Sequence, residues 1–296
     1  MSQAPRVSIV VIVKNGMPYI RTAIESLTMQ NCGDFEVVVQ DAASTDGTTE
    51  YLQSVKGLDL SLDPRPDNGQ SQAYNRGFAR CRGDIIGTVD ADNWLEPNAI
   101  STAVKIFEGR SDAAALYGSF NVVDTLGKFV EVYRFPPFDR MNLIQNVLVP
   151  PFGASFFNRT ICGDALFSNE EVKHCQDFGI WLRLSDKTIL QIDDILCSVR
   201  SSPKSETCNI EFYDKFCLHK CNMLDDYLAE LANAPLRESL RRMGRAGIYC
   251  WAAESALILS GEGDDYRRFR GLAAREDPGN FRLLSMERRL RKAHAA

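Results

Sequence analysis

The chain has 296 residues, of which 45% are hydrophobic and 25% charged, and its formal net charge is −5. These fractions are typical of a globular protein with a buried core, and the length allows one large domain or two modest ones. The acidic balance argues against the dominant basic surface that binds nucleic-acid phosphates, so we expect no nucleic-acid partner.

Cysteine usage and the absence of membrane signals favour a cytoplasmic protein. Nine cysteines are scattered along the chain without a CxxC pair. An odd count without regular spacing fits reduced thiols better than a disulfide framework. The opening MSQAPR carries no signal-peptide pattern, and no apolar run reaches the roughly 18 residues of a membrane span.

The first 120 residues alternate between apolar runs and segments with helical spacing. Strands are expected at 7–13, 35–40, 58–63, 84–89 and 114–119, and helices at 18–30, 44–55, 71–81 and 96–109. Continuous β-branched runs such as VSIVVIV are typical of strands buried on both faces of a parallel sheet. The alternation predicts an α/β sheet with right-handed crossovers.

The pattern changes after residue 120. A hairpin is expected over 121–134 with its turn at 125–127, followed by strands at 154–159 and 188–200 and a short helix at 176–185. From about residue 210 onward only helical patterns remain. We predict an α/β domain over 1–208 and a helical C-terminal extension over 209–296, with the boundary near the polar segment SSPKSET.

Carboxylates follow two of the expected strands. Asp41 ends the strand at 35–40, and Asp90 and Asp92 follow the strand at 84–89. Ligands of open α/β sheets bind beyond the carboxyl ends of the strands, and an acid there is costly to bury unless it is solvated, hydrogen-bonded or metal-bound. Two carboxylates in Asp-x-Asp lie on one side of an extended segment, roughly 7 Å apart. That spacing suits a divalent cation that also binds phosphate oxygens; a turn with solvated acids is the alternative.

Four segments carry a family resemblance. They are, in order, VSIVVIVKN, VVVQDAASTDGT, PDNGQSQAYNRGFARCRGDIIGTVDADNW and QDFGIWLRL. Together they resemble the family 2 glycosyltransferases, over roughly residues 7–200. The resemblance implies the GT-A fold, a Rossmann-like, mixed and mainly parallel sheet flanked by helices. It also implies an inverting, hexosyl-type transfer from a nucleotide-diphosphate sugar, usually UDP-linked, to a hydroxyl of a growing glycan or a lipid-linked saccharide.

The resemblance implies roles for several residues around the nucleotide. Asp41 matches an acid that bonds the base, and a carboxylate can accept the imide N–H of uracil. Asp67, Gln70 and Asn75 match the loop and helix that line the nucleotide. Many relatives carry a second acid where this chain has Ala42, so base recognition is expected to depend more on Asp67 and on backbone groups. The alternative for Asp41 is that it caps the turn that follows.

Asp90 and Asp92 match the D-x-D motif of the family. There the first acid contacts the ribose and the second ligates Mn²⁺ or Mg²⁺, and Asp90 can also reach the ion. The ion stabilises the charge that develops on the diphosphate leaving group. Some similar enzymes add a His after the last strand, but this chain has none there, so we expect waters to complete the shell.

Asp177 matches the acid that acts as general base on the acceptor hydroxyl. Many relatives have Glu before it, where this chain has Gln176, so Asp177 is the sole strong candidate. The alternative role is the N-cap of the helix at 178–185, a frequent use of Asp, and the two roles are compatible.

The C-terminal segment 281–296 is basic and carries several leucines. Two interpretations are open: peripheral contact with an anionic membrane at its inner face, where lipid-linked acceptors are found, or a packed helix with a solvated basic face. The preceding helices can serve packing, an oligomer contact or acceptor selection.

Two other classes of protein compete with a glycosyltransferase. A non-catalytic protein with the same fold could bind nucleotide-sugars or glycans, although the intact acids Asp41, Asp90, Asp92 and Asp177 argue against it. A sugar-phosphate nucleotidyltransferase needs a Gly-rich basic loop after the first strand. The stretch VKNGMPYI in that position has one Gly and one Lys.

Overall fold

The structure, a computed structural model, describes residues 6–202 and 205–295, with side chains as far as residue 289. It divides into two compact units. The first comprises Met1–Phe138, Pro150–Gln176 and Leu184–Ser202, and the second comprises Asp139–Val149, Asp177–Arg183 and Pro203–Ala296. The boundary at 208 stays a prediction; part of SSPKSET, and most of the opening MSQAPR, lie outside the described residues.

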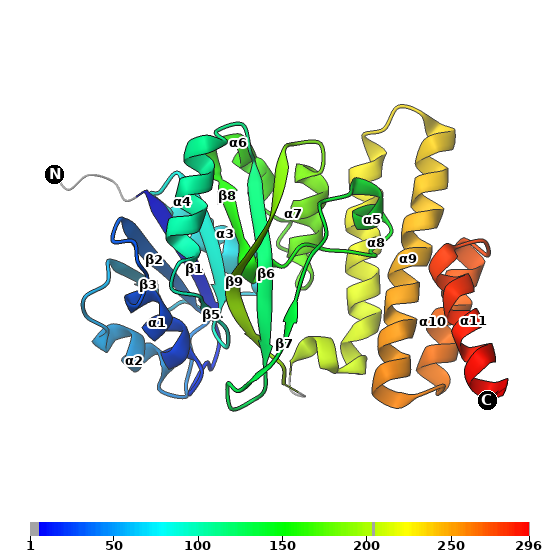
Figure 1. Ribbon diagram of the computed structural model, residues 1–296, viewed down its shortest axis with the longest axis horizontal. Coiled ribbons are helices and arrows are strands. Elements are labelled where there is room, and N and C mark those ends of the chain that lie inside the picture. The colour runs from blue at the N-terminus through cyan, green and yellow to red at the C-terminus, as the bar shows by residue number, and fades with distance from the viewer. Residues whose placement is uncertain (1–5, 203–204, 296) are drawn as a thin grey trace. The chain divides into compact units, whose positions relative to one another are not determined.

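A nine-stranded mixed sheet forms the centre of the first unit, in the order β3-β2-β1-β4-β8-β6-β9-β5, with β7 paired to β6 (Figure 1). Its strands are β1 Val7–Val13, β2 Phe35–Asp41, β3 Leu60–Asp63, β4 Ile85–Asp90, β5 Trp94–Leu95, β6 Ala115–Val123, β7 Phe129–Tyr133, β8 Ser155–Asn158 and β9 Ile189–Arg200. Strands β1 to β4 are parallel to one another, as are β6 and β9. Strand β8 runs antiparallel between β4 and β6. The predicted mixed, mainly parallel sheet is confirmed.

Helices cover both faces of this sheet. They are α1 Ile20–Thr28, α2 Thr48–Ser54, α3 Gln70–Arg80, α4 Ala99–Gly109 and α6 Arg159–Cys162, with 3₁₀ turns η1 Phe152–Ala154 and η2 Gly163–Leu166. The apolar residues of α1, α2 and α4 pack against the side of β1 that carries Val7, Ile9 and Val11. Helix α3 covers the other side, where a Cβ on Gly77 would lie 2.6 Å from Val10 Cγ1.

The second unit is helical, as the sequence pattern predicts. It contains α5 Arg140–Ile144, most of α7 Gln176–Leu184, η3 Glu206–Cys208, η4 Ile210–Phe212, α8 Tyr213–Ala229, α9 Ala234–Ser260, α10 Asp264–Glu276 and α11 Phe281–Ala295. Small residues on α9 allow close packing: a Cβ on Gly247 would lie 1.9 Å from the carbonyl oxygen of Gln145. Within the described residues, none of the helices combines the length and apolarity needed to cross a membrane.

The basic helix α11 packs against its own unit. Leu283 and Met286 are buried. Arg282 forms an ion pair of 2.5 Å with Glu254 of α9, and Arg289 pairs with the same carboxylate at 3.0 Å. These contacts favour the packed-helix interpretation for the part that is described, whereas the side chains of residues 290–296 lie outside it.

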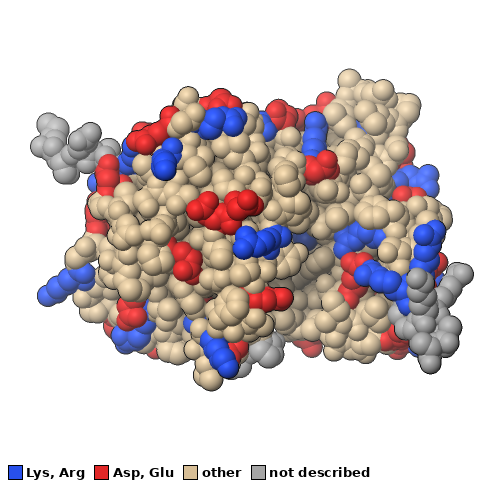
Figure 2. All heavy atoms as spheres, in the orientation of Figure 1, with Lys and Arg blue, Asp and Glu red and all other residues tan. Residues whose placement is uncertain are grey.

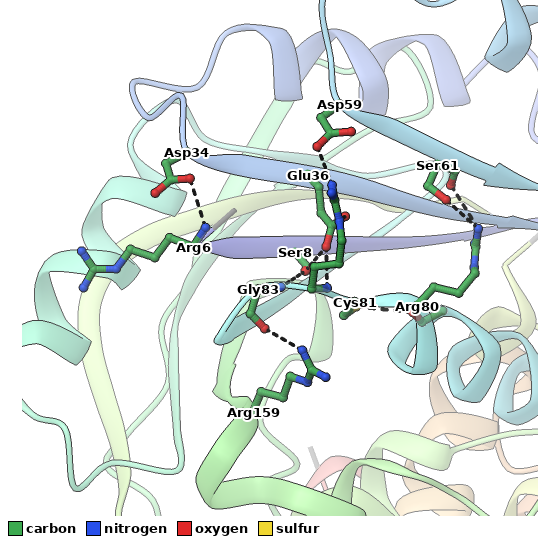
Figure 3. Close-up of polar contacts among 12 residues, drawn as sticks. Arg6, Ser8, Asp34, Glu36, Asp59, Ser61, Arg80, Cys81, Gly83 and Arg159 are labelled. Atoms are coloured by element: carbon green, nitrogen blue, oxygen red, sulfur yellow. Dashed lines mark hydrogen bonds and ion pairs between the residues drawn. The ribbon is translucent and has the colours of Figure 1, made fainter. Parts of the chain in front are cut away.

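A polar network joins the amino ends of β1, β2 and β4 (Figure 3). Glu36, only 2% exposed, accepts hydrogen bonds from Ser8 Oγ at 2.6 Å and from the Arg82 backbone N–H at 2.6 Å. Arg82 also pairs with Glu36 through Nε and with Asp59 through Nη2. This buried acid lies at the edge opposite to the one that ends in Asp41 and Asp90, so its role is structural.

The surface charges are of mixed sign, and most cysteines are buried. On the face drawn in Figure 2, acidic and basic side chains are interspersed. None of the nine cysteines forms a disulfide, and six of them are buried. The six buried cysteines therefore act as small core residues.

Candidate active site

Two of the predicted acids lie on either side of the end of β1. In the sheet register Val13 pairs with Asp41 and Ile12 pairs with Asp90. Because neighbouring strands are about 4.8 Å apart, the backbones of the two acids are roughly 10 Å apart. The rule that ligands bind at carboxyl strand ends therefore brings both acids to one edge of the sheet.

Asp90 is held by two side-chain donors. The hydroxyl of Tyr74, from α3, donates to Oδ1 at 3.2 Å, and the amide of Asn93 donates to Oδ2 at 3.0 Å. The backbone of Gly153 passes close by, since a Cβ there would lie 3.6 Å from Oδ2. The two hydrogen bonds thus fix the orientation of the carboxylate.

Asp92 is partly buried two residues further on. Burial raises the pKa of this carboxyl above its ordinary value, and the positive charge of Arg200 opposes the rise. A desolvated carboxylate gains by binding a cation, so this residue suits a divalent ion. Among the described residues there is no cluster of three or more His, Cys, Asp or Glu side chains that could hold an ion alone. Any ion would therefore complete its shell with water and donor phosphates, as Mg²⁺ commonly does.

Asp41 is fully buried, and its carboxylate is engaged locally. Ser44 donates to Oδ1 from its backbone N–H at 3.0 Å and from Oγ at 2.5 Å, and Thr49 Oγ1 donates to Oδ2. In this structure Asp41 therefore caps the turn that follows it. Contact with a nucleotide base stays a prediction.

Two residues predicted to contact the donor lie at the start of α3, one in the preceding loop and one in the helix. Asp67 Oδ1 accepts the backbone N–H of Gly69 at 3.0 Å, and Gly69 has a φ of +131°, which favours glycine. Gln70 is the first residue of α3 and is half-buried. The first N–H groups of this helix are available to an anion.

Asn75 faces another segment of the same unit. Its Nδ2 donates to the carbonyl of Ser168 at 2.8 Å, and its Oδ1 accepts the Ser168 backbone N–H at 2.9 Å. The side chain therefore anchors α3 to residue 168. Its predicted donor contact stays a prediction.

Asp177 belongs to the second unit and lies in the first turn of α7. Burial raises the pKa of this carboxyl, and the charge of Lys220 and the Phe178 backbone N–H act in the opposite direction. Lys220 of α8 is only 7% exposed, and its Nζ donates to Asn146 Oδ1 at 3.0 Å. The same ammonium lies 4.2 Å from the centre of the Trp251 ring and 5.6 Å from that of Phe178.

Sequence reasoning missed the residues that support the acids. They are Tyr74, Asn93, Arg200 and Lys220. Arg200 ends strand β9, so the same strand-end rule applied to this strand would have found it. Asn93 follows Asp92 directly but carries no motif of its own, and nothing in the sequence pairs Lys220 with Asp177.

Comparison with known proteins establishes the family. Residues 8–165, more than half of the chain, match the model of glycosyl transferase family 2. The chain therefore belongs to this family, and the resemblance found in its motifs is confirmed.

Curated relatives share only part of their length with the chain. It is 26% identical over 189 residues to a hyaluronan synthase of Pasteurella multocida, which covers 63% of this chain and 19% of that protein. It is 28% identical over 164 residues to an uncharacterized glycosyltransferase of Mycobacterium tuberculosis, covering 54% and 62% respectively. The chain thus spans about a fifth of the length of the synthase.

Solved structures agree with the fold over most of the chain. The crystal structure of residues 1–349 of TarS from S. aureus, in complex with UDP-GlcNAc, has a TM-score of 0.68 at 16% identity and covers 96% of this chain and 92% of that one. The mannosyltransferase PcManGT from Pyrobaculum calidifontis, in complex with GDP-Man and Mn²⁺, has a TM-score of 0.59 at 16% identity, covering 96% and 86%. At these identities the likeness establishes the fold, and the expected GT-A fold is confirmed.

Proposed function

We propose that this glycosyltransferase moves a sugar from a nucleotide-diphosphate donor, with a UDP-sugar favoured, to a hydroxyl of a saccharide or a lipid-linked saccharide. The D-x-D segment at the carboxyl edge of the sheet carries the proposal. Asp90 is oriented by Tyr74 and Asn93, and Asp92 is desolvated beside it. The complexes of TarS with UDP-GlcNAc and of PcManGT with GDP-Man support a donor of this class.

A divalent ion, Mn²⁺ or Mg²⁺, fits this arrangement. Asp92 would hold it, with Asp90 beside it for the ribose or the ion, and the other ligands would be water and phosphate oxygens. When bound, the ion would stabilise negative charge on the departing diphosphate. The Mn²⁺ bound in PcManGT supports this choice.

The chain offers further groups to the donor. Asp67 and the buried Asp41 can accept an imide N–H from a uracil base. Gln70 and the free N–H groups at the start of α3 can bind phosphate oxygens. Asn75 would hold this helix in place through its bonds to the Ser168 backbone.

Asp177 would act as the general base. A raised pKa makes the carboxylate a stronger base than an exposed Asp, which suits removal of the acceptor proton as the hydroxyl attacks. Attack on the face of the sugar opposite the diphosphate would invert the anomeric centre in a single displacement.

A membrane and a second copy of the chain are two further partners to consider. Contact of α11 with an anionic membrane would have to use basic residues other than Arg282 and Arg289, because Glu254 pairs with both. Oligomer formation through the helices of the second unit is a separate proposal, and size-exclusion chromatography with light scattering tests it.

Turnover is the experiment that separates an enzyme from a binding protein. UDP-, dTDP- and GDP-sugars would be incubated with the chain and a panel of saccharide acceptors, in Mn²⁺ or in EDTA, and nucleotide release would be measured. We expect release from one nucleotide class in Mn²⁺ only, and its loss in Asp177→Asn. Nucleotide binding without release in any combination would favour the non-catalytic alternative.

A further inference from the structure

Arg200 is a buried charge at the end of β9, only 7% exposed. Its guanidinium forms no ion pair with a carboxylate within the part of the chain that the structure describes. Instead it donates to three backbone carbonyls: Nε to Asp92 at 3.2 Å, and Nη1 to Asp124 at 3.3 Å and Thr125 at 2.9 Å. A buried cation needs such oxygen partners to replace its hydration.

These bonds join two segments that are distant in sequence. One is the D-x-D segment, and the other is the turn at 124–127 between β6 and β7. The backbone N–H of Arg200 also donates to Asn93 Oδ1 at 2.9 Å, and Asn93 in turn holds Asp90. One residue thus fixes the backbone at Asp92 directly and the carboxylate of Asp90 through Asn93.

Two aromatic rings orient the guanidinium. Its carbon lies 4.5 Å from the ring centre of Tyr19 and 5.4 Å from that of Trp94. A planar guanidinium can contact ring faces and donate along its edges at the same time, whereas the point charge of a lysine cannot reproduce this geometry. The position of Arg200 therefore requires the planar shape of a guanidinium as well as its positive charge.

The bond to the carbonyl of Asp92, rather than to its carboxylate, is the informative detail. An arginine paired with the carboxylate would compete with a divalent cation for the same oxygens. Here the Arg200 guanidinium fixes the main chain at Asp92. The Asp92 carboxylate itself forms no ion pair with the described residues.

We propose that Arg200 is a positioning residue that holds the D-x-D segment in the geometry required for metal-dependent binding of the donor diphosphate. This inference rests on the proposed function. Supporting residues around metal ligands typically contribute about 10–100-fold in metal affinity or activity. We expect an effect of that size on nucleotide binding in Mn²⁺ and little effect in EDTA.

Calorimetry on the full chain tests this role, with UDP as the probe in saturating Mn²⁺ and in EDTA. The variants are Arg200→Gln and Arg200→Lys. The control is Arg134→Gln, because Arg134 is exposed and donates to the carbonyl of Asp193 at 3.4 Å on the same sheet. We expect UDP affinity in Mn²⁺ to fall about 10–100-fold in Arg200→Gln, to fall in Arg200→Lys as well, and to stay unchanged in the control.

Each other outcome has a distinct meaning. Wild-type binding that persists in both Arg200 variants would overturn the positioning role alone. An equal loss with and without Mn²⁺, accompanied by a lower melting temperature, would reduce Arg200 to a packing residue. If Arg200→Gln does not fold, the UDP affinity of Arg200→Lys in Mn²⁺ decides between these outcomes. A wild type that binds no UDP, dTDP or GDP would overturn the proposed function together with this role.

Discussion

The side-chain amide of Asn93 donates to Asp90 Oδ2 across 3.0 Å, and this bond fixes the first acid of the D-x-D motif. The other end of the same amide accepts the backbone N–H of Arg200 at 2.9 Å. Asn93 is only 6% exposed, so neither bond exchanges readily with water. Asn93, the residue after the D-x-D motif, is therefore part of the same site.

Replacing Asn93 by Ala is expected to weaken nucleotide binding in Mn²⁺ without unfolding the protein. Loss of a hydrogen bond to a charged group costs about 1.5–3 kcal/mol, and part of that cost would appear as roughly tenfold weaker UDP binding. Calorimetry measures it, with Asn31→Ala as control, because Asn31 is exposed and donates to Asn98 Oδ1 away from the carboxyl edge of the sheet. Equal affinity in Asn93→Ala and wild type would show that Asp90 does not need this partner.

Asp177→Asn is expected to lower turnover strongly while preserving or raising stability. General-base catalysis contributes about 10²–10⁴-fold, so nucleotide release in the presence of acceptor should fall by that order. Because burial raises the pKa of Asp177, its contribution to stability is greatest below the ordinary value of 3.8 and is lost as the pH rises through the raised value. At neutral pH the amide removes this cost, and the melting temperature should not fall. Wild-type turnover in Asp177→Asn would exclude Asp177 as the base.

Lys220 is expected to set the pH at which Asp177 becomes active. Its positive charge favours the ionised carboxylate and so lowers the pKa of Asp177 against the effect of burial. In Lys220→Met the pKa should rise, and the acid limb of the kcat/KM profile should move to higher pH. Lys215→Met is the matched control on the same helix, since Lys215 is exposed and lies over the Phe212 ring. An acid limb that does not move would indicate that Lys220 serves packing alone.

Glu36→Gln is expected to destabilise the sheet without affecting the donor site (Figure 3). Burial alone would raise the pKa of Glu36, but hydrogen bonds from Ser8 and Arg82 outweigh it and hold the pKa below 4.5. The stabilising contribution is therefore present above pH 4.5 and is lost as the pH falls through the lowered value. Since Arg82 is half exposed, we expect a loss of about 1.5–3 kcal/mol, mainly from the hydrogen bonds.

Urea unfolding at pH 7 and at successively lower pH values measures the effect of Glu36→Gln. The control is Asp112→Asn, which removes an exposed pair with Arg110 and should change the free energy of unfolding by less than about 0.5 kcal/mol. A loss in Glu36→Gln that does not shrink at any lower pH would contradict the ionised network.

The strands and long helices could be predicted because local pattern determines them. β1 matches the run VSIVVIV residue for residue, and Ile20, Ile24 and Leu27 form the buried face of α1 as their spacing predicts. Helix α4 begins at Ala99, later than the expected start at residue 96. Residues 96 and 97 bond to other segments: the backbone N–H of Glu96 donates to the Leu196 carbonyl, and the carbonyl of Pro97 accepts the Asn31 N–H.

The site was predicted in part, for a similar reason. The acids Asp41 and Asp90 stand at strand ends, so topology alone brings them to one edge of the sheet. The partners of these acids come from long-range contacts: Tyr74 lies on a helix and Arg200 is more than a hundred residues from Asp92. No periodicity or motif encodes such pairings, which only the folded chain displays.

The central claim is that Asp90 and Asp92 form a metal-dependent site for a nucleotide diphosphate. The most direct measurement is calorimetry of UDP, dTDP and GDP, each with and without Mn²⁺, on wild type and Asp92→Ala. We predict that one nucleotide binds far more tightly with Mn²⁺ than without it and that Asp92→Ala loses this gain. Binding of no nucleotide under any condition, or binding that is indifferent to both Mn²⁺ and Asp92, would contradict the claim.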